Sequence, residues 1–211
     1  MSDVPESPPR SWAEVDLSAL RHNLAAARGL SDQQVMAVVK ASAYGHGLEA
    51  VACALEQEEI AFFGVANVGE ARRLSKTGVR TPIYLLGGTF PAEREEVVAH
   101  RWLPCLNTMG EALHFDELAR NGGAVVEAHL TVDTGMGRGG FLPGDAPAAL
   151  EAIRTLPGIQ VTGLGSHLPS ADEDSEFTHD QFEAFDSLVE SLPRRNELRH
   201  VHLANSAGLL G

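Results

Sequence analysis

Short apolar runs alternate with amphipathic segments along most of this 211-residue chain. The apolar runs have the length and branched composition of buried strands, and the amphipathic segments repeat with the period of a helix. We expect strands at residues 35–40, 62–66, 82–86, 103–106, 125–132, 159–163 and 198–203. We expect helices between them at residues 48–57, 69–76, 92–100, 111–120, 147–155 and 177–192. Regular alternation of this kind predicts parallel strands joined by helical crossovers.

Two architectures satisfy this alternation, a (β/α)8 TIM barrel and an open doubly wound sheet. Polar and glycine-rich strings follow several different strands, which is where barrel active sites are built. The turn after the first strand contains neither GxGxxG nor GxxxxGK[ST], which argues against a Rossmann or P-loop domain. The sequence therefore predicts an α/β fold, a (β/α)8 TIM barrel. About seven strands are present, so we expect an incomplete barrel whose first and seventh strands expose their edges.

The first residues differ in composition from the rest of the chain. Residues 1–10 are polar and proline-rich, so we expect a disordered tail there and no signal peptide. We assign residues 11–211 to the barrel domain. Within it, Ser11–Leu17 alternates like a strand, and we expect Ser18 to cap a helix that runs to about Arg28.

Composition excludes several kinds of partner and site. The formal net charge of −13 argues against nucleic acid and anionic membranes as partners, and no apolar run is long enough to span a bilayer. Cys53 and Cys105 lack CxxC spacing, so we expect both to be reduced core residues of a cytoplasmic protein. Histidines such as His46 and His129 lack metal-ligand spacing, and we predict neither a metal site nor a catalytic role for them.

Lys40 closes the first apolar run and is followed by small residues, one tyrosine and two glycines. Burial of its stem disfavours the ammonium form, which leaves the free amine that attacks a carbonyl to form a Schiff base. Tyr44 adds a hydroxyl in the same loop, and Gly45 and Gly47 let the backbone approach a ligand closely. For a lone lysine, the ordinary alternative is a strand-end side chain that reaches out to solvent.

The string Val38–Gly47 resembles the cofactor-lysine segment of the alanine racemase family, with Ser42 in place of the usual asparagine. Asp133–Arg138 matches the DTGMGR segment of that family, and His202–Ala207 resembles its HxANSA segment. The resemblance covers nearly all of this chain but only the N-terminal part of a family member, whose C-terminal β-domain has no counterpart in this sequence. We therefore expect an N-terminal fragment, from a truncated or split gene or from a degenerate paralogue.

The resemblance implies a pyridoxal 5′-phosphate (PLP) site. In the family the lysine, here Lys40, carries PLP as a Schiff base and moves the proton at the substrate Cα. The cofactor-binding positions that the resemblance implies are Lys40, Tyr44, His167, Asn205 and Ser206. Tyr44 and Ser206 would bind the phosphate, Asn205 would support Ser206, and His167 would lie beside the pyridine ring. For Tyr44, His167 and Ser206 the ordinary alternatives are a packed tyrosine, a hydrogen-bonded structural histidine and an N-cap.

Arg138 is the substrate-binding residue that the resemblance implies, through the ring oxygen of the cofactor and the carboxylate of the amino acid. Its ordinary alternative is a surface arginine after a glycine turn. Thr131 stands where many alanine racemases carry a lysine that steadies this arginine. A threonine offers only a hydroxyl there, so the positioning of Arg138 and the substrate preference stay open.

The function implied by the resemblance is that of a PLP-dependent alanine racemase, which interconverts L-alanine and D-alanine and supplies D-alanine for peptidoglycan. A full-length member is expected to be a homodimer in which the partner's C-terminal domain supplies a second base. That base and the arginine opposite the pyridine nitrogen have no counterpart here, so we expect reduced activity. The alternatives are a truncated barrel that binds PLP without turnover, a racemase of another amino acid such as serine, and another PLP barrel enzyme such as a decarboxylase or aldolase. The two glycine-containing motifs argue against the last of these.

Overall fold

A computed structural model describes residues 11–211, so the tail expected at residues 1–10 lies outside the described residues. Seven parallel strands form one sheet in which each strand pairs with its neighbour in the chain. The strands are β1 (Met36–Val38), β2 (Phe62–Val65), β3 (Ile83–Leu85), β4 (Leu103–Leu106), β5 (Val126–Thr131), β6 (Ile159–Gly165) and β7 (His200–His202). A doubly wound sheet would reverse its strand order at a switch point, so the sequential order confirms the barrel prediction.

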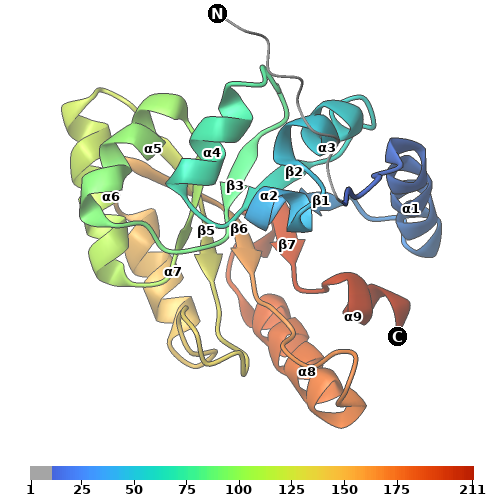
Figure 1. Cartoon of the computed structure of the whole chain (residues 1–211). Helices are drawn as coiled ribbons and strands as arrows, with labels where there is room; N and C mark the ends of the chain where they lie inside the picture. The colour runs from blue at the N-terminus through green and yellow to red at the C-terminus, as the bar shows by residue number, and fades with distance from the viewer. Residues whose placement is uncertain (1–10) are drawn as a thin grey trace, which may run out of the picture.

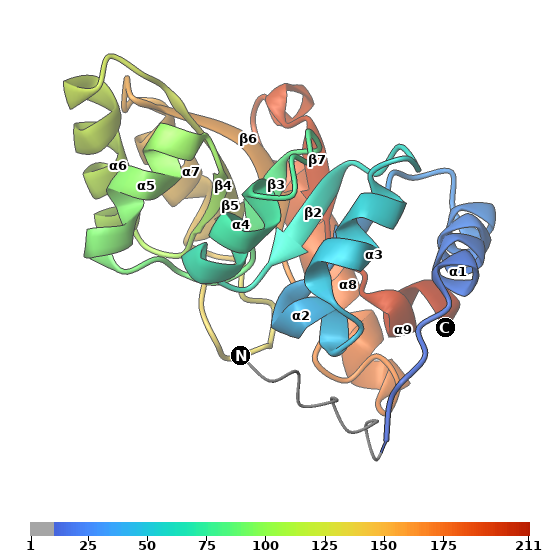
Figure 2. The ribbon, with the colours of Figure 1, turned by 45° about the horizontal axis from the view of Figure 1, so that its top comes forward.

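Helices cover the outer face of this curled sheet (Figure 1). They are α1 (Leu17–Leu30), α2 (Lys40–Tyr44), α3 (Leu48–Leu55), α4 (Val68–Ser75), α5 (Arg94–His100), α6 (Met109–Asn121), α7 (Ala146–Arg154), α8 (Ser175–Ser191) and α9 (Ser206–Leu210), with 3₁₀ turns at Pro91–Glu93 and Arg195–Glu197. The curvature brings the two ends of the sheet toward each other, since α1 contacts α9 (Figure 2). None of the helices in residues 11–211 is both long and apolar enough to traverse a lipid bilayer.

The two faces of the sheet differ in chemistry. The outer face packs aliphatic and aromatic side chains such as Phe63, Leu85 and Leu130 against the helices, and all three are fully buried. The inner face holds a smaller cluster around Phe62 and Tyr84. Barrel interiors are usually filled by branched aliphatic residues, so an interior of aromatic and polar groups is a specific feature of this chain.

The outer edges of the sheet carry no partner strand within residues 11–211. β1 pairs only with β2 and β7 only with β6, as expected for an incomplete barrel. Val201 at the β7 edge is 48% exposed. Unpaired edge strands present free N–H and C=O groups to other chains.

Three local predictions were wrong. Residues 11–16 form no strand, because they pair with no other strand in the described chain, and helix α1 already begins at Leu17. Asp16 caps α1 in place of Ser18, since its Oδ1 accepts from the N–H of Ser18 at 2.8 Å. Cys53 is exposed on α3, whereas Cys105 is buried as expected; both thiols are free.

Candidate active site

The predicted site residues all follow the carboxyl ends of strands. Lys40 and Tyr44 follow β1, Arg138 follows β5, and His167 follows β6. Asn205 and Ser206 follow β7. In a parallel barrel these strand ends meet at one rim.

Lys40 opens a turn of unusual handedness. Ala41, Ser42, Ala43 and Tyr44 have φ angles of 50°, 56°, 54° and 55°, so α2 is a left-handed helical turn. Such a conformation costs a non-glycine residue roughly 1–2 kcal/mol. Strained backbone of this kind persists only where the surrounding structure holds it in place.

A glutamate from the next βα unit contacts this turn. The Oε1 atom of Glu70 accepts from the N–H of Ala41 at 2.7 Å, and its Oε2 atom accepts from the N–H of Ala66 at 2.8 Å. Hydrogen bonds to a charged group contribute about 1.5–3 kcal/mol each. The carboxylate of Glu70 therefore joins the turn after β1 to the end of β2.

Glu70 was not among the residues predicted from the sequence. The signal was present, because Asn67 caps α4 and Glu70 follows three residues later, which is the spacing of a capping box.

The glycine-rich loop that carries Arg138 is closed by Asp133. Its Oδ1 atom accepts from the N–H groups of Gly135 and Gly137, each at 3.0 Å. Burial opposes ionisation of Asp133, but these hydrogen bonds outweigh it and lower the pKa of the carboxyl group. The carboxylate thus stays ionised and holds the loop in shape.

This loop is also fixed to the end of β6. The hydroxyl groups of Thr134 and Ser166 share a hydrogen bond of 2.9 Å. The side-chain amide of Gln181, on α8, donates to the Thr134 hydroxyl at 3.2 Å and more weakly to the His167 carbonyl at 3.4 Å. Gln181 is fully buried, so α8 holds the segments of Arg138 and His167 together.

His167 shares an electrostatic environment with two other predicted residues. Burial lowers its pKa, and the positive charges of Arg138 and Lys40 lower it further. Burial and the charges of Arg138 and Lys40 therefore favour a neutral imidazole at His167.

The residues after β7 are joined to the same rim. Asn205 caps α9 by accepting from the N–H of Gly208 at 2.9 Å, and its side-chain amide donates to the Leu168 carbonyl at 2.8 Å. The N-cap alternative for Ser206 is therefore wrong, because Ser206 is the first residue inside the helix. Tyr44 is 61% exposed rather than packed in its loop, and the Nζ atom of Lys40 lies 5.9 Å from the centre of its ring.

Two histidines lie inside the barrel below the rim, His129 fully buried and His202 half-buried. The Nδ1 atom of His129 is 3.1 Å from the Nε2 atom of His202. Burial, followed by the charges of neighbouring histidines, lowers the pKa of His129 to about 2 and that of His202 to about 4. Their rings fit because β6 has glycine opposite each, Gly163 beside His129 and Gly165 beside His202, where a Cβ atom would collide with the ring. Within residues 11–211, no three His, Cys, Asp or Glu side chains are arranged to hold a metal ion.

Comparison with known protein families identifies the family of this chain. Residues 15–211 match the protein family described as "Alanine racemase, N-terminal domain". The chain belongs to this family. Thr131, the departure from the alanine racemase pattern, is half-buried at the end of β5 and pairs with Gly165.

Curated and solved relatives give the same family. The alanine racemase of Halothermothrix orenii is 34% identical over 204 residues, which cover 95% of this chain and 54% of the relative. The alanine racemase of Clostridium difficile 630 superposes with a TM-score of 0.90 at 29% identity, over 97% of this chain and 55% of that one. A histidine racemase from Leuconostoc mesenteroides superposes with a TM-score of 0.83 at 27% identity, over 92% and 52%. The chain thus spans about half the length of the alanine racemases it matches.

Proposed function

We propose that this chain is the cofactor-binding portion of a PLP-dependent racemase that acts on alanine. The observation that supports the proposal is that Lys40, Arg138 and His167 lie in segments that follow the carboxyl ends of β1, β5 and β6, in a chain that belongs to the alanine racemase N-terminal domain family. The side chains at the rim have the chemistry that PLP requires. The amine of Lys40 suits its aldehyde, the guanidinium of Arg138 suits its ring oxygen, and Ser206 suits its phosphate.

Each residue has a role that follows from its chemistry. PLP, when bound, supplies an electron sink for the charge that develops at the substrate Cα. Lys40 would hold PLP through Nζ and would afterwards accept or return the proton at Cα. Arg138 would orient the substrate carboxylate with its planar fork. Tyr44 would donate its hydroxyl to the phosphate.

The remaining two positions support the site. His167 would lie against the pyridine ring as a neutral imidazole, because burial and two nearby cations lower its pKa. Asn205 would fix Ser206 through its bonds to Gly208 and Leu168.

The amino acid itself is a second question. We propose alanine because the curated relatives are alanine racemases. A structural neighbour that is a histidine racemase, together with Thr131 in place of the family lysine, makes an amino acid other than alanine the second candidate. For the whole protein we propose a cytoplasmic homodimer that supplies D-alanine for peptidoglycan.

Covalent trapping tests the proposal directly. The chain contains two lysines, Lys40 and Lys76, and Lys76 is exposed at the end of α4. After incubation with PLP and reduction by borohydride, peptide mass mapping should find the label on Lys40. Lys76→Arg should retain this label and Lys40→Arg should lose it. Label on Lys76 with none on Lys40 would contradict the proposal.

Binding without turnover is the remaining alternative. In heavy water with PLP present, the chain should exchange the Cα proton of alanine in a manner that requires Lys40. Trapping on Lys40 without any such exchange would favour the binding-only alternative.

A further inference from the structure

Two βα units of this chain carry the string Gly-Glu-Ala in the first turn of a helix. Asn67-Val68-Gly69-Glu70-Ala71 opens α4, and Thr108-Met109-Gly110-Glu111-Ala112 opens α6. In each, the first residue caps the helix by accepting from the N–H of the glutamate, at 3.0 Å from Asn67 and 3.2 Å from Thr108. Each glutamate then reaches back to the N–H of the residue before the cap.

The backward hydrogen bonds are equivalent. Glu70 accepts from the N–H of Ala66 at 2.8 Å, and Glu111 accepts from the N–H of Asn107 at 2.7 Å. Each bond joins the end of a strand to the first turn of the next helix. This backward hydrogen bond therefore stabilises the fold in both units.

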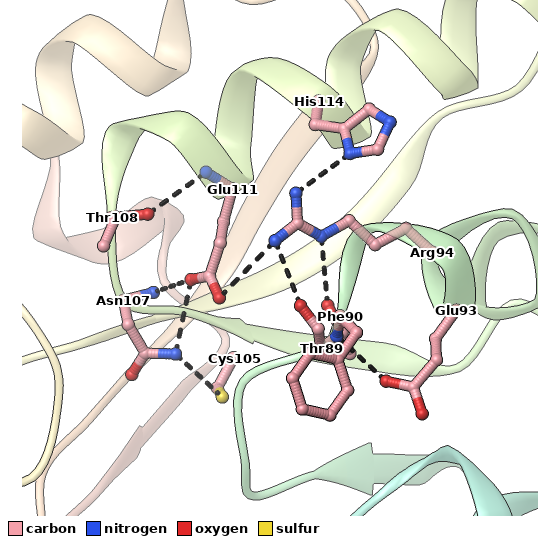
Figure 3. A network of polar contacts seen from close by, with 9 residues as sticks. All are labelled: Thr89, Phe90, Glu93, Arg94, Cys105, Asn107, Thr108, Glu111 and His114. Carbon is pink, nitrogen blue, oxygen red and sulfur yellow. Dashed lines mark hydrogen bonds and ion pairs between the residues drawn. The ribbon is translucent and has the colours of Figure 1, made fainter.

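The two glutamates differ in what the second oxygen of the carboxylate contacts. In Glu111 it lies 3.9 Å from the guanidinium of Arg94, which itself bonds Thr89 and His114 (Figure 3). In Glu70 the second oxygen accepts from the N–H of Ala41 at 2.7 Å. Glu111 thus reaches another helix, whereas Glu70 reaches the residue directly after Lys40.

We propose that Glu70 is a positioning residue for Lys40. The N–H of Ala41 belongs to the peptide group whose carbonyl is that of Lys40, so a bond to this N–H fixes the plane that follows the Lys40 Cα atom. That plane and the preceding strand determine the direction in which the lysine side chain leaves the backbone. The inference rests on the proposed function, in which Lys40 holds PLP.

The geometry requires a carboxylate at this position. The side chain of Glu70 must accept two N–H groups from two different strand ends, and a carboxylate offers two acceptor oxygens. Glutamine has nearly the same shape but only one acceptor, so Glu70→Gln leaves one N–H facing an amide NH₂. The left-handed turn from Ala41 to Tyr44 would then lose the contact that joins it to β2.

The test compares Glu70→Gln with Glu111→Gln, which removes the matched carboxylate away from Lys40. The first measurement is amide hydrogen exchange of the peptide that covers residues 40–47, without cofactor. We expect exchange there to accelerate about tenfold or more in Glu70→Gln, since the N–H of Ala41 loses its acceptor, and to stay near the wild-type rate in Glu111→Gln. The second measurement is the rate of borohydride-trapped PLP on Lys40, which should fall in Glu70→Gln only.

Two outcomes would overturn the inference. One is an equal effect of both variants on residues 40–47, which would mean that exchange follows overall stability alone. The other is an unchanged trapping rate in Glu70→Gln. If Glu70→Gln does not fold, Glu70→Asp keeps the charge and both acceptors on a shorter arm, and the same contrast with Glu111→Asp applies. Failure of the wild-type chain to trap PLP on Lys40 would instead overturn the proposed function, and the exchange contrast would still decide whether Glu70 holds the turn.

Discussion

At the scale of single residues, His129 and His202 inside the barrel make stability depend on pH. In the unfolded chain a histidine binds a proton below a pH of about 6.5, whereas burial lowers the pKa of His202 to about 4 in the folded chain. Between these values the unfolded state binds more protons, so the free energy of unfolding falls as the pH falls. His129, with its pKa lowered to about 2, extends the same effect further into acid.

Replacement of His202 by glutamine should flatten this dependence. Each such histidine contributes about 1.4 kcal/mol per pH unit within its window. Urea denaturation between pH 6.5 and pH 5 should therefore show a slope that is smaller by about this amount in His202→Gln than in the wild-type chain. His22→Gln, at an exposed position on α1, is the control and should keep the wild-type slope. Identical slopes in all three proteins would contradict the assignment.

Site residues were predictable where chemistry and a contiguous string coincide. Lys40, Arg138 and His167 could be named from the sequence, and all three follow the carboxyl ends of parallel strands. Glu70 was missed because its partner, Ala41, lies far from it in sequence and the bond involves a backbone group that no side-chain pattern reveals. The pairing of His129 with His202 was missed because the two residues lie far apart in sequence. Their contact depends on the register of β5, β6 and β7.

At the scale of elements, the left-handed turn after β1 is the clearest departure from local propensity. The sequence predicted a strand that continues to Lys40, but β1 ends at Val38 and the backbone turns at Val39, with φ −117° and ψ 21°. Alanine and serine seldom adopt positive φ, so nothing local in Ala41–Ala43 signals the turn. Contacts with other elements, the carboxylate of Glu70 among them, override the local preference.

Replacing an alanine by glycine should therefore change the free energy of unfolding in opposite directions in two neighbouring helices. Ala41 has φ 50° and is exposed, so Ala41→Gly should relieve strain and stabilise the fold by up to about 1 kcal/mol. Ala50 is exposed in the right-handed helix α3, so Ala50→Gly should destabilise it by about 1 kcal/mol. Chemical denaturation of the two variants measures both changes in the free energy of unfolding. Destabilisation of similar size by both would mean that the turn at Ala41 is not left-handed.

At the scale of the whole molecule, the alternation of apolar and amphipathic segments predicted all seven strands of the sheet. It succeeded because the strands of a parallel sheet have both faces covered and their sequences read as continuous apolar runs. The same reasoning failed for Ser11–Leu17, where alternation alone suggested a strand. A strand also needs a neighbour to pair its backbone groups, and no described strand lies beside residues 11–16.

The arrangement of the rim leads to a prediction about activity. Racemisation requires a proton donor and a proton acceptor on opposite faces of the substrate Cα. We assign proton transfer in this chain to Lys40, on one face, and in the resembled family the second base comes from the partner subunit's C-terminal domain. Residues 1–211 assayed by themselves with PLP would then leave protonation of the opposite face to water.

A single positioned acid–base group typically contributes 10²–10⁴-fold to a rate. In heavy water, exchange of deuterium into the Cα position of D-alanine should therefore exceed the interconversion of D-alanine and L-alanine by roughly that factor. Both rates are measured in one sample, by mass spectrometry and by chiral chromatography, and both should disappear in Lys40→Arg. Interconversion as fast as exchange would show that these residues contain a second proton-transfer group.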